Sequence, residues 1–231
     1  MKCWGVIPAA GIGSRLGAAL PKQYLEIGGR TLLEHSLRAL LADTRVAGVA
    51  VALRAGDERA AGLACLRDPR VLLTEGGAER ADSVAAGLAA LRERAGDDDW
   101  VLVHDAARPC LDAGSLAALI DAVAASGRGA ILAQPVSDTV KRSDDGTTVA
   151  ATVDRRSLWL AQTPQLFRLG ELASALSAAG AVTDEASAME AAGYPVGLVP
   201  GPRSNLKVTT AEDLVLARCL LAAGENGGES D

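Results

Sequence analysis

The stretch Pro8-Ala-Ala-Gly-Ile-Gly-Ser-Arg-Leu-Gly-Ala-Ala-Leu-Pro-Lys22 decides how the rest of the chain is arranged. It follows the apolar and partly β-branched residues 3–7, which predict a buried parallel strand. Gly11 and Gly13 have no Cβ and can adopt positive φ, so the backbone N–H groups after the strand can turn together toward an anion. The stretch therefore predicts a phosphate-binding loop at the end of the first strand.

Two side chains of this loop are positively charged, and the loop differs from the better-known glycine loops. Arg15 and Lys22 can stabilise charge that develops on a reacting phosphate. A dinucleotide-binding loop needs G-x-G-x-x-G, but Leu16 stands where the third glycine belongs and Gly17 comes one residue late. A P-loop needs Gly-Lys-Ser/Thr, which is absent from this stretch. These features indicate a nucleoside triphosphate site, and a Gly/Ala-rich surface loop without a ligand is the alternative.

The composition limits the class of protein. A chain of 231 residues predicts one domain, for which we expect residues 1–223, with a core large enough to fold on its own. Hydrophobic residues make up 49% of the chain and aromatic residues only 3%, so Ala, Leu and Val must fill that core. The net charge of -6 leaves no basic stripe, which argues against binding to nucleic acid or to a membrane surface.

The cysteines and histidines show no metal-binding spacing. Cysteines stand at positions 3, 65, 110 and 219 without a C-x-x-C pair, and the two histidines are His35 and His104. Reduced thiols are the expected state, which indicates the cytoplasm. No apolar run approaches the roughly 18 residues of a transmembrane helix, and proline and glycine interrupt any signal peptide. We therefore expect a soluble, cytoplasmic protein.

Strands and helices alternate along the chain as in an α/β protein. Apolar runs predict strands at residues 3–7, 46–53, 71–74, 100–104, 129–134 and 196–199. Helical spacing predicts helices at residues 31–41, 57–66, 115–125, 170–179, 184–192 and 210–222, and a long one that opens in the stretch 75–83 and ends near residue 94. The Gly- and Glu-rich residues 224–231 predict a disordered tail.

Two further loops bring polar residues to strand ends. Gly77 and Ser83 lie in Glu75-Gly-Gly-Ala-Glu-Arg-Ala-Asp-Ser83, where glycines and a helix N-terminus can hold a base or a sugar. Asp105 and Arg108 follow the strand at 100–104. Ligands of open parallel sheets lie beyond the carboxyl ends of the strands, so Asp105 is placed to meet Mg²⁺ on a triphosphate. A turn-capping Asp105 and a surface Arg108 are the alternatives.

Residues 136–158 depart from the alternation of strand and helix. Asp138-Thr-Val-Lys-Arg142, the turn Ser143-Asp-Asp-Gly146 and residues 147–153 alternate like a β-hairpin. A hairpin of this length has no core of its own and should bury one face against a neighbour, for which another subunit is the favoured choice. We therefore expect residues 136–158 to form the dimerisation arm of a homodimer.

Six motifs occur in an order that resembles a known family. They are Pro8-Ala-Ala-Gly-x-Gly-x-Arg15, Pro21-Lys-Gln-Tyr24, Val103-His-Asp-Ala-Ala-Arg-Pro109, Thr163-Pro-Gln165, Thr183-Asp-Glu-Ala-Ser187 and Asn205-Leu-Lys-Val208. Across about residues 3–222 they resemble the 2-C-methyl-D-erythritol 4-phosphate cytidylyltransferases. The resemblance implies a Rossmann-like, doubly wound, mostly parallel sheet with a protruding β-hairpin dimerisation arm. It also implies Mg²⁺ dependence and transfer of CMP from CTP to methylerythritol phosphate in the non-mevalonate isoprenoid pathway, with release of pyrophosphate.

The resemblance implies a role for each matching residue. Arg15 and Lys22 are implied as catalytic residues and Asp105 as the Mg²⁺ ligand. The residues implied for CTP are Pro8, Ala9, Ala10, Gly11, Gly13, Gly77, Ser83, Asp105 and Lys207. Those implied for the acceptor are Arg108, Thr139, Arg155, Thr183 and Lys207, with Arg155 reaching the site of the partner subunit. Some relatives have Asp where this chain has Ala78, so one side-chain contact to the base is absent.

Three other functions stay open at the level of the sequence. The first is a cytidylyltransferase for another alditol phosphate, such as ribitol 5-phosphate. The second is a nicotinamide-dependent reductase, against which the loop cations and the missing third glycine argue. The third is a nucleotide-binding module without catalysis, which an assay of pyrophosphate release distinguishes.

Overall fold

A seven-stranded sheet forms the centre of the molecule, for which a computed structural model describes residues 1–11, 20–180 and 182–226. Its strands are β1 (Cys3–Ala9), β4 (Val46–Leu53), β5 (Val71–Glu75), β6 (Trp100–Val103), β7 (Ala130–Pro135), β10 (Trp159–Arg168) and β11 (Gly197–Pro200). Their order across the sheet is β11-β7-β10-β6-β1-β4-β5. Every neighbouring pair is parallel except the two that β10 makes with β6 and β7. The expected mostly parallel sheet is confirmed.

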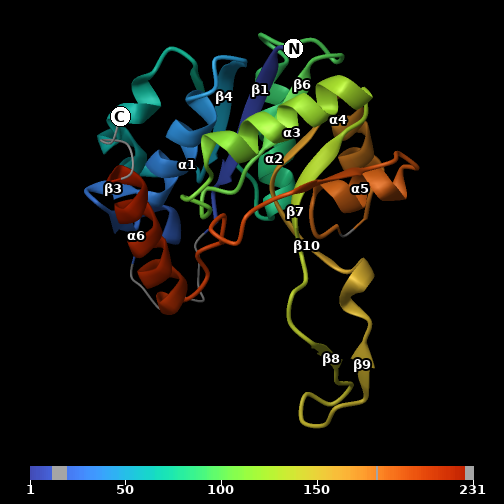
Figure 1. Ribbon diagram of the computed structural model, residues 1–231. Coiled ribbons are helices and arrows are strands. Elements are labelled where there is room, and N and C mark those ends of the chain that lie inside the picture. The colour runs from blue at the N-terminus through green and yellow to red at the C-terminus, as the bar shows by residue number, and fades with distance from the viewer. Residues whose placement is uncertain (12–19, 181, 227–231) are drawn as a thin grey trace.

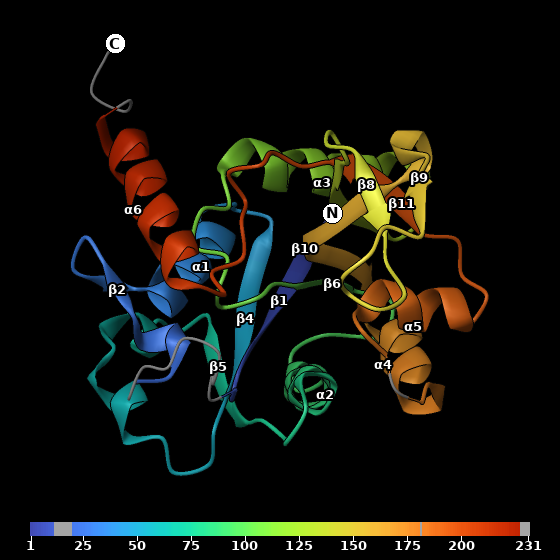
Figure 2. The same cartoon turned by 90° about the horizontal axis from the view of Figure 1, so that it is seen from below.

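Helices cover both faces of the sheet (Figure 2). The helices α1 (Leu32–Leu41) and α3 (Ala113–Ser126) lie on one face, and α2 (Arg80–Leu91), α4 (Leu169–Ala178) and α5 (Glu185–Ala191) lie on the other. Each face has its own apolar cluster, with Leu37 and Ile120 in one and Val84 and Leu172 in the other. The helix α6 (Ala211–Asn226) lies beside α1 and packs on Ile27 through Ala217. This two-sided cover is the doubly wound arrangement expected.

The central position of β1 follows from its composition. Six of its seven residues are buried, as expected for a parallel strand covered by helices on both faces. On one face α2 comes very close, because Gly87 has no side chain there. A Cβ added to Gly87 would lie 2.5 Å from Cγ1 of Val6. Close packing of α2 on β1 fixes the loop before α2 relative to the end of β1.

A small hairpin that the sequence analysis did not expect precedes α1. It consists of β2 (Glu26–Ile27) and β3 (Arg30–Thr31), joined by Gly28 and Gly29 at φ of 58° and 73°. Two consecutive positive φ values are the requirement of a tight two-residue hairpin turn, and glycine meets it without strain. Thr31, predicted as the first helical residue, is instead the N-cap of α1 and forms a capping box with Glu34.

The prediction of one helix over residues 57–66 is wrong. The chain forms two short 3-10 helices there, η3 (Glu58–Gly62) and η4 (Ala64–Arg67). Gly62 costs helical stability, and Leu63 after it is extended, with φ of -83° and ψ of 110°. The long helix α2 likewise ends at Leu91, three residues before the predicted end.

The hairpin arm projects away from the body of the molecule (Figure 1). It carries β8 (Val140–Arg142), β9 (Ala151–Val153) and the 3-10 helix η5 (Arg155–Ser157), and β8 and β9 pair antiparallel. The second strand is shorter than the predicted 147–153, because the Asp145 carboxylate accepts hydrogen bonds from the backbone of Thr147 and Thr148 and holds them in the turn. The expected hairpin is present.

The end of the chain differs from the prediction. The helix α6 continues to Asn226, so residues 224–226 of the predicted tail are helical, and residues 227–231 lie outside the described residues.

Within the described ranges, no helix is long and apolar enough to cross a membrane. All four cysteines are free thiols.

Candidate active site

Two adjoining pockets open at the carboxyl ends of β1 and β6. These strands are neighbours at the point where the order of the sheet reverses, which is the usual ligand position in doubly wound folds. Pocket A is lined by Pro8, Ala9, Ala10, Gly11, Lys22, Gln23, Gly77, Ala78, Glu79, Arg80, Ser83, Asp105, Ala106, Ala107 and Lys207. Pocket B is lined by Arg80, Asp105, Arg108, Ala161, Gln162, Thr163, Gln165, Thr183, Asp184 and Lys207. Arg80, Asp105 and Lys207 line both pockets and form the wall between them.

Pocket A brings together most of the residues predicted to bind CTP. Pro8, Ala9, Ala10, Gly11, Gly77, Ser83, Asp105 and Lys207 all line it, and Lys22 joins them. Gly13 and Arg15 lie outside the described residues. A Cβ added to Gly76 would lie 2.6 Å from the Cβ of Ala10 and 2.7 Å from Oγ of Ser83. The loop before α2 therefore packs against the end of β1 because residue 76 has no side chain.

Neighbouring side chains hold Lys22 in pocket A. Lys22 begins the short 3-10 helix η2 (Lys22–Tyr24). The buried Gln23 donates from Nε2 to the carbonyl of Ala9 at 2.8 Å, and the Tyr24 hydroxyl donates to Oδ2 of Asp57 at 2.8 Å. One contact ties η2 to the end of β1 and the other ties it to the segment after β4. The backbone that carries the Lys22 cation is therefore held in place.

The wall between the pockets is part of a chain of four charged side chains. Asp105 accepts hydrogen bonds from Nε of Arg80 at 2.9 Å and from Nζ of Lys207 at 2.7 Å. Arg80 also donates from Nη1 and Nη2 to both oxygens of Glu185, at 2.6 and 3.0 Å. In space the order is Lys207, Asp105, Arg80, Glu185, so positive and negative side chains alternate. Asp105 is therefore not a turn cap: its carboxylate faces two cations.

The charges around Asp105 and Arg80 keep these two groups ionised. Burial alone would raise the pKa of Asp105, but Arg80 and Lys207 outweigh it and hold that pKa well below the usual range. Burial alone would lower the pKa of Arg80, but Asp105 and Glu185 outweigh it and raise that pKa. Asp105 is consequently a carboxylate, and Arg80 a cation, across the physiological pH range.

A second set of hydrogen bonds fixes the backbone of Asp105. Its N–H donates to Oγ1 of Thr163 at 3.0 Å, and Thr163 Oγ1 lies 3.0 Å from Nδ1 of His104. The other ring nitrogen, Nε2, lies 3.1 Å from the carbonyl of Arg108. Burial lowers the pKa of His104 to about 4, so the ring is neutral. One proton arrangement satisfies all three contacts: Thr163 donates to Nδ1, and Nε2–H donates to Arg108.

Pocket B contains three of the five residues predicted for the acceptor. Arg108, Thr183 and Lys207 line it. Nη1 of Arg108 donates to the carbonyl of Asn205 at 2.6 Å, and its buried Nε has no hydrogen-bond partner among the residues that the structure describes. Thr139 and Arg155 lie exposed on the arm and line neither pocket. Within one subunit, the structure does not bring them to the other three.

Several residues of the site were given no role in the sequence analysis, although Thr163, Glu185 and Asn205 lie in motifs quoted there. Arg80, Glu185 and Thr163 form the contacts around Asp105, and Asn205 supports Thr163 by donating from Nδ2 to its carbonyl at 2.9 Å. One signal was available for Arg80. It is the first residue of α2, where the helix dipole favours acidic side chains over basic ones, so a cation there indicates a partner outside the helix.

The metal prediction can be tested against the donor atoms. Among the described residues, no group of three or more His, Cys, Asp or Glu side chains could hold a metal ion. Mg²⁺ on a nucleotide needs only one or two protein carboxylates, because phosphates and water supply its other ligands. Each oxygen of Asp105 accepts one hydrogen bond in the wall and keeps a further lone pair. Asp105 therefore fits the role of a single ligand to a nucleotide-bound ion.

An open sheet, and a pocket of cations around one carboxylate at the switch point, fit a nucleotidyltransferase. The family model described as 2-C-methyl-D-erythritol 4-phosphate cytidylyltransferase matches residues 3–223. The chain belongs to this family, and it is therefore a cytidylyltransferase.

Individual relatives agree with the family. The protein of that name from Aeromonas hydrophila is 56% identical over 216 residues, which cover 92% of this chain and 86% of the relative. The one from Pseudomonas aeruginosa PAO1 is 51% identical over 217 residues, which cover 92% and 93%. A crystal structure of 4-diphosphocytidyl-2C-methyl-D-erythritol synthase has a TM-score of 0.83 at 42% identity and covers 95% of this chain and 99% of its own. The cytidylyltransferase from Thermus thermophilus has a TM-score of 0.79 at 38% identity, with 96% and 100% covered.

Proposed function

We propose that the chain transfers CMP from CTP to 2-C-methyl-D-erythritol 4-phosphate, giving 4-diphosphocytidyl-2-C-methyl-D-erythritol and pyrophosphate. The observation that carries this proposal is the pair of pockets that share Arg80, Asp105 and Lys207 as a common wall. Two substrates that occupy adjoining pockets and contact the same three side chains can have their reacting groups next to each other. Transfer between them then needs no covalent intermediate with the protein.

Pocket A is the CTP site in this proposal. Gly11 leaves room for a phosphate, since a Cβ added there would have no neighbour within 4 Å among the described residues. Pro8, Ala9 and Ala10 would continue the cradle, with Gly77 and Ser83 at the cytosine or ribose. Lys22, together with Arg15 of the loop, would stabilise the charge that develops as a phosphate oxygen of the acceptor attacks the α-phosphorus and pyrophosphate leaves.

Pocket B is the acceptor site. Arg108 and Lys207 offer positive charge and Thr183 a hydroxyl, which suits a phosphorylated polyol. Thr139 and Arg155 would complete this site from the arm of a second subunit. A homodimer is supported by the exposed apolar side chains of the arm and of the adjoining end of β10, among them Val149 and Leu160, which are 64% and 56% exposed.

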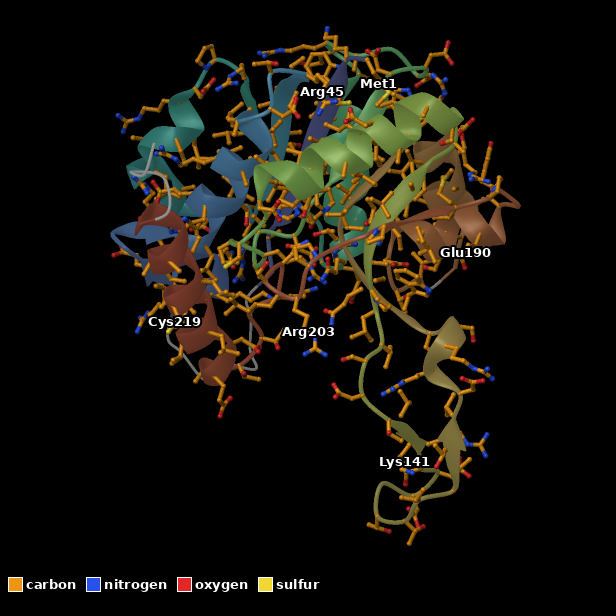
Figure 3. The ribbon with its side chains drawn as sticks, in the orientation of Figure 1. Met1, Arg45, Lys141, Glu190, Arg203 and Cys219 are labelled. Carbon is orange, nitrogen blue, oxygen red and sulfur yellow. The ribbon has the colours of Figure 1, made fainter. Side chains whose placement is uncertain are left out.

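The base of the arm is tied to the acceptor side of the body. Arg203, in the loop after β11, contacts the Ser137 hydroxyl and lies 3.8 Å from the Asp138 carboxylate. Figure 3 shows Arg203 pointing out of the body on the side of the arm, and Lys141 near the far end of the arm. This anchor supports an arm that is held in one direction, as a dimer interface requires.

Mg²⁺ is the cofactor in this proposal, with Asp105 as its ligand in the protein. When bound, the ion would neutralise charge on the triphosphate. We also propose a cytoplasmic location, which the four free cysteines support.

The reaction is tested by incubating the purified protein with CTP, Mg²⁺ and a panel of alditol phosphates, with product identification by mass spectrometry. We expect the methylerythritol phosphate product and pyrophosphate in equal amounts. A ribitol 5-phosphate product instead would contradict the acceptor assignment, and the names of the relatives do not favour it. No product with any acceptor would contradict the proposal as a whole.

The residue assignment is tested separately. Lys22→Ala and Arg15→Ala should each lower turnover by about two to three orders of magnitude, because each removes one preorganised charge from the transition state. Arg155→Ala should weaken acceptor binding more than CTP binding. Mixing Arg155→Ala subunits with Lys22→Ala subunits should restore activity, because hybrid dimers would contain one intact site. No recovery in hybrids shown to be dimeric by sedimentation would contradict the exchange of arms.

A further inference from the structure

We propose that Glu185 is a positioning residue of this enzyme: it holds the Arg80 guanidinium against Asp105 and thereby fixes the carboxylate that separates the nucleotide from the acceptor. The inference rests on the proposed function, because it takes pockets A and B as the two substrate sites. Glu185 itself lines neither pocket, and its side chain is 1% exposed. Its effect must therefore pass through Arg80.

The geometry of the contact favours positioning over simple charge balance. Both oxygens of Glu185 accept from Arg80, at 2.6 and 3.0 Å, while Nε of the same guanidinium donates to Asp105 at 2.9 Å. The guanidinium of Arg80 thus uses three donors, two toward Glu185 and one toward Asp105. A guanidinium held by two parallel hydrogen bonds has a defined plane, so the direction of its Nε–H toward Asp105 is also defined.

Glu185 is in turn rigidly placed. It is the first residue of α5, whose N-cap is Asp184, and a capping box links Asp184 with Ser187. Gln165 of β10 donates from Nε2 to Asp184 at 2.9 Å and accepts from the backbone N–H of Ala186 at 2.8 Å. The start of α5 is therefore fastened to the sheet on both sides of Glu185. The backbone of Glu185 cannot shift unless these contacts break, and its carboxylate is held by the two hydrogen bonds from Arg80.

The charges also require Glu185. Without it, Arg80 would have Asp105 as its remaining carboxylate partner in the wall, and could turn toward the phosphates on either side, since it lines both pockets. With it, the guanidinium of Arg80 lies between two carboxyl groups and stays beside Asp105. Asp105 then keeps one cation on each side, Arg80 at one oxygen and Lys207 at the other.

The test compares Glu185→Gln with Asp97→Asn as a matched control. Glutamine keeps the shape of Glu185, but only its carbonyl oxygen can accept from Arg80, so one of the two parallel hydrogen bonds is lost, together with the negative charge. Asp97 forms an exposed pair with Arg92 just after α2, at 3.0 Å, and lines neither pocket. For each protein we would measure kcat and KM for both substrates by pyrophosphate release, CTP affinity with Mg²⁺ by titration calorimetry, and the thermal midpoint.

We expect Glu185→Gln to unfold cooperatively, to lose about 10- to 100-fold in kcat/KM, and to bind CTP with Mg²⁺ more weakly, as changes behind a metal ligand commonly do. Asp97→Asn should match the wild type in all these values. Wild-type kcat/KM and CTP affinity in a folded Glu185→Gln protein would overturn the inference. So would a loss of activity that merely follows the unfolded fraction, with KM and CTP affinity unchanged.

A second variant covers the case in which Glu185→Gln does not fold. Arg80→Lys keeps the charge, but an ammonium cannot reach two carboxylates in one plane, so it tests the same contact from the other side under the same criteria. A wild-type protein that transfers no CMP would contradict the proposed function. The calorimetric comparison would still decide the inference in that case, since CTP affinity is measured without turnover.

Discussion

Thr163→Val should destabilise the fold, although the substitution hardly changes the size of the side chain. The Thr163 side chain is buried, and its hydroxyl accepts from the N–H of Asp105 and donates to Nδ1 of His104. Valine has nearly the same shape, so packing is retained while both hydrogen bonds are lost. Asp105 and His104 are 6% and 0% exposed, so water cannot replace the hydroxyl.

The magnitude follows from the groups left without partners. An unsatisfied buried donor or acceptor costs about 1–3 kcal/mol, so two of them should lower the free energy of unfolding by about 2–6 kcal/mol. Thr163→Ser is the matched control, because it keeps the hydroxyl and removes one buried methyl group, at a cost of about 1 kcal/mol. The valine variant should therefore be clearly less stable than the serine variant.

The assay is urea unfolding followed by circular dichroism, with the free energy extrapolated linearly to zero denaturant. The slope with urea should be equal in the three proteins, which shows that the same structure unfolds. If Thr163→Val loses no more stability than Thr163→Ser, the hydroxyl does not hold the Asp105 backbone, and the proton arrangement derived above is refuted.

Two further substitutions and one labelling experiment test other parts of the structure. Gly76→Val should raise the KM for CTP at least several-fold in the pyrophosphate assay, because even its Cβ would lie 2.6 Å from the Cβ of Ala10 and push the two loops of pocket A apart. Hydrogen bonds at the start of α6 outweigh burial and lower the pKa of Asp213, so Asp213→Asn should cost about 1 kcal/mol at pH 7, and this difference should shrink as the pH falls below about 4, where the unfolded carboxyl binds its proton first. Native protein should react with a thiol reagent at exposed Cys219 well before Cys3, whose burial raises its pKa to about 11, as peptide mapping would show.

The strands and their loops were predictable because their signals are local. Residues 46–53 were predicted as a strand and form β4 with the same bounds, since the run is apolar and bounded by polar residues. The position of Asp105 was predictable for the same reason: a polar residue that directly follows a buried strand must lie at the edge of the sheet where ligands bind. The alternation of strands and helices then indicated a doubly wound sheet.

The contacts that position the site were not predictable in the same way. Arg80 and Glu185 are 105 positions apart, and each lies at the start of a helix whose direction depends on packing against the sheet. The sequence shows that both are charged, but the choice of partner depends on which loops the fold brings together. The failed helix at 57–66 has the opposite cause. Its residues suit a helix, but Gly62 and the extended Leu63 interrupt it locally.

The antiparallel strand of the central sheet, β10, explains why the arm and the site are connected. β10 leaves the arm at Trp159 and pairs with β7 as far as Ala161, and its pairing resumes at Gln165 after a shift in register. The residues between lie at the carboxyl end of β6, where the shift frees Thr163 to bind the backbone of Asp105. The arm follows β7 at the carboxyl edge of the sheet. A strand parallel to β7 would have to begin at the opposite edge, so the chain could not pass directly from the arm into it. Reversal of β10 therefore lets one continuous segment join the dimerisation arm proposed above to the carboxylate between the two pockets.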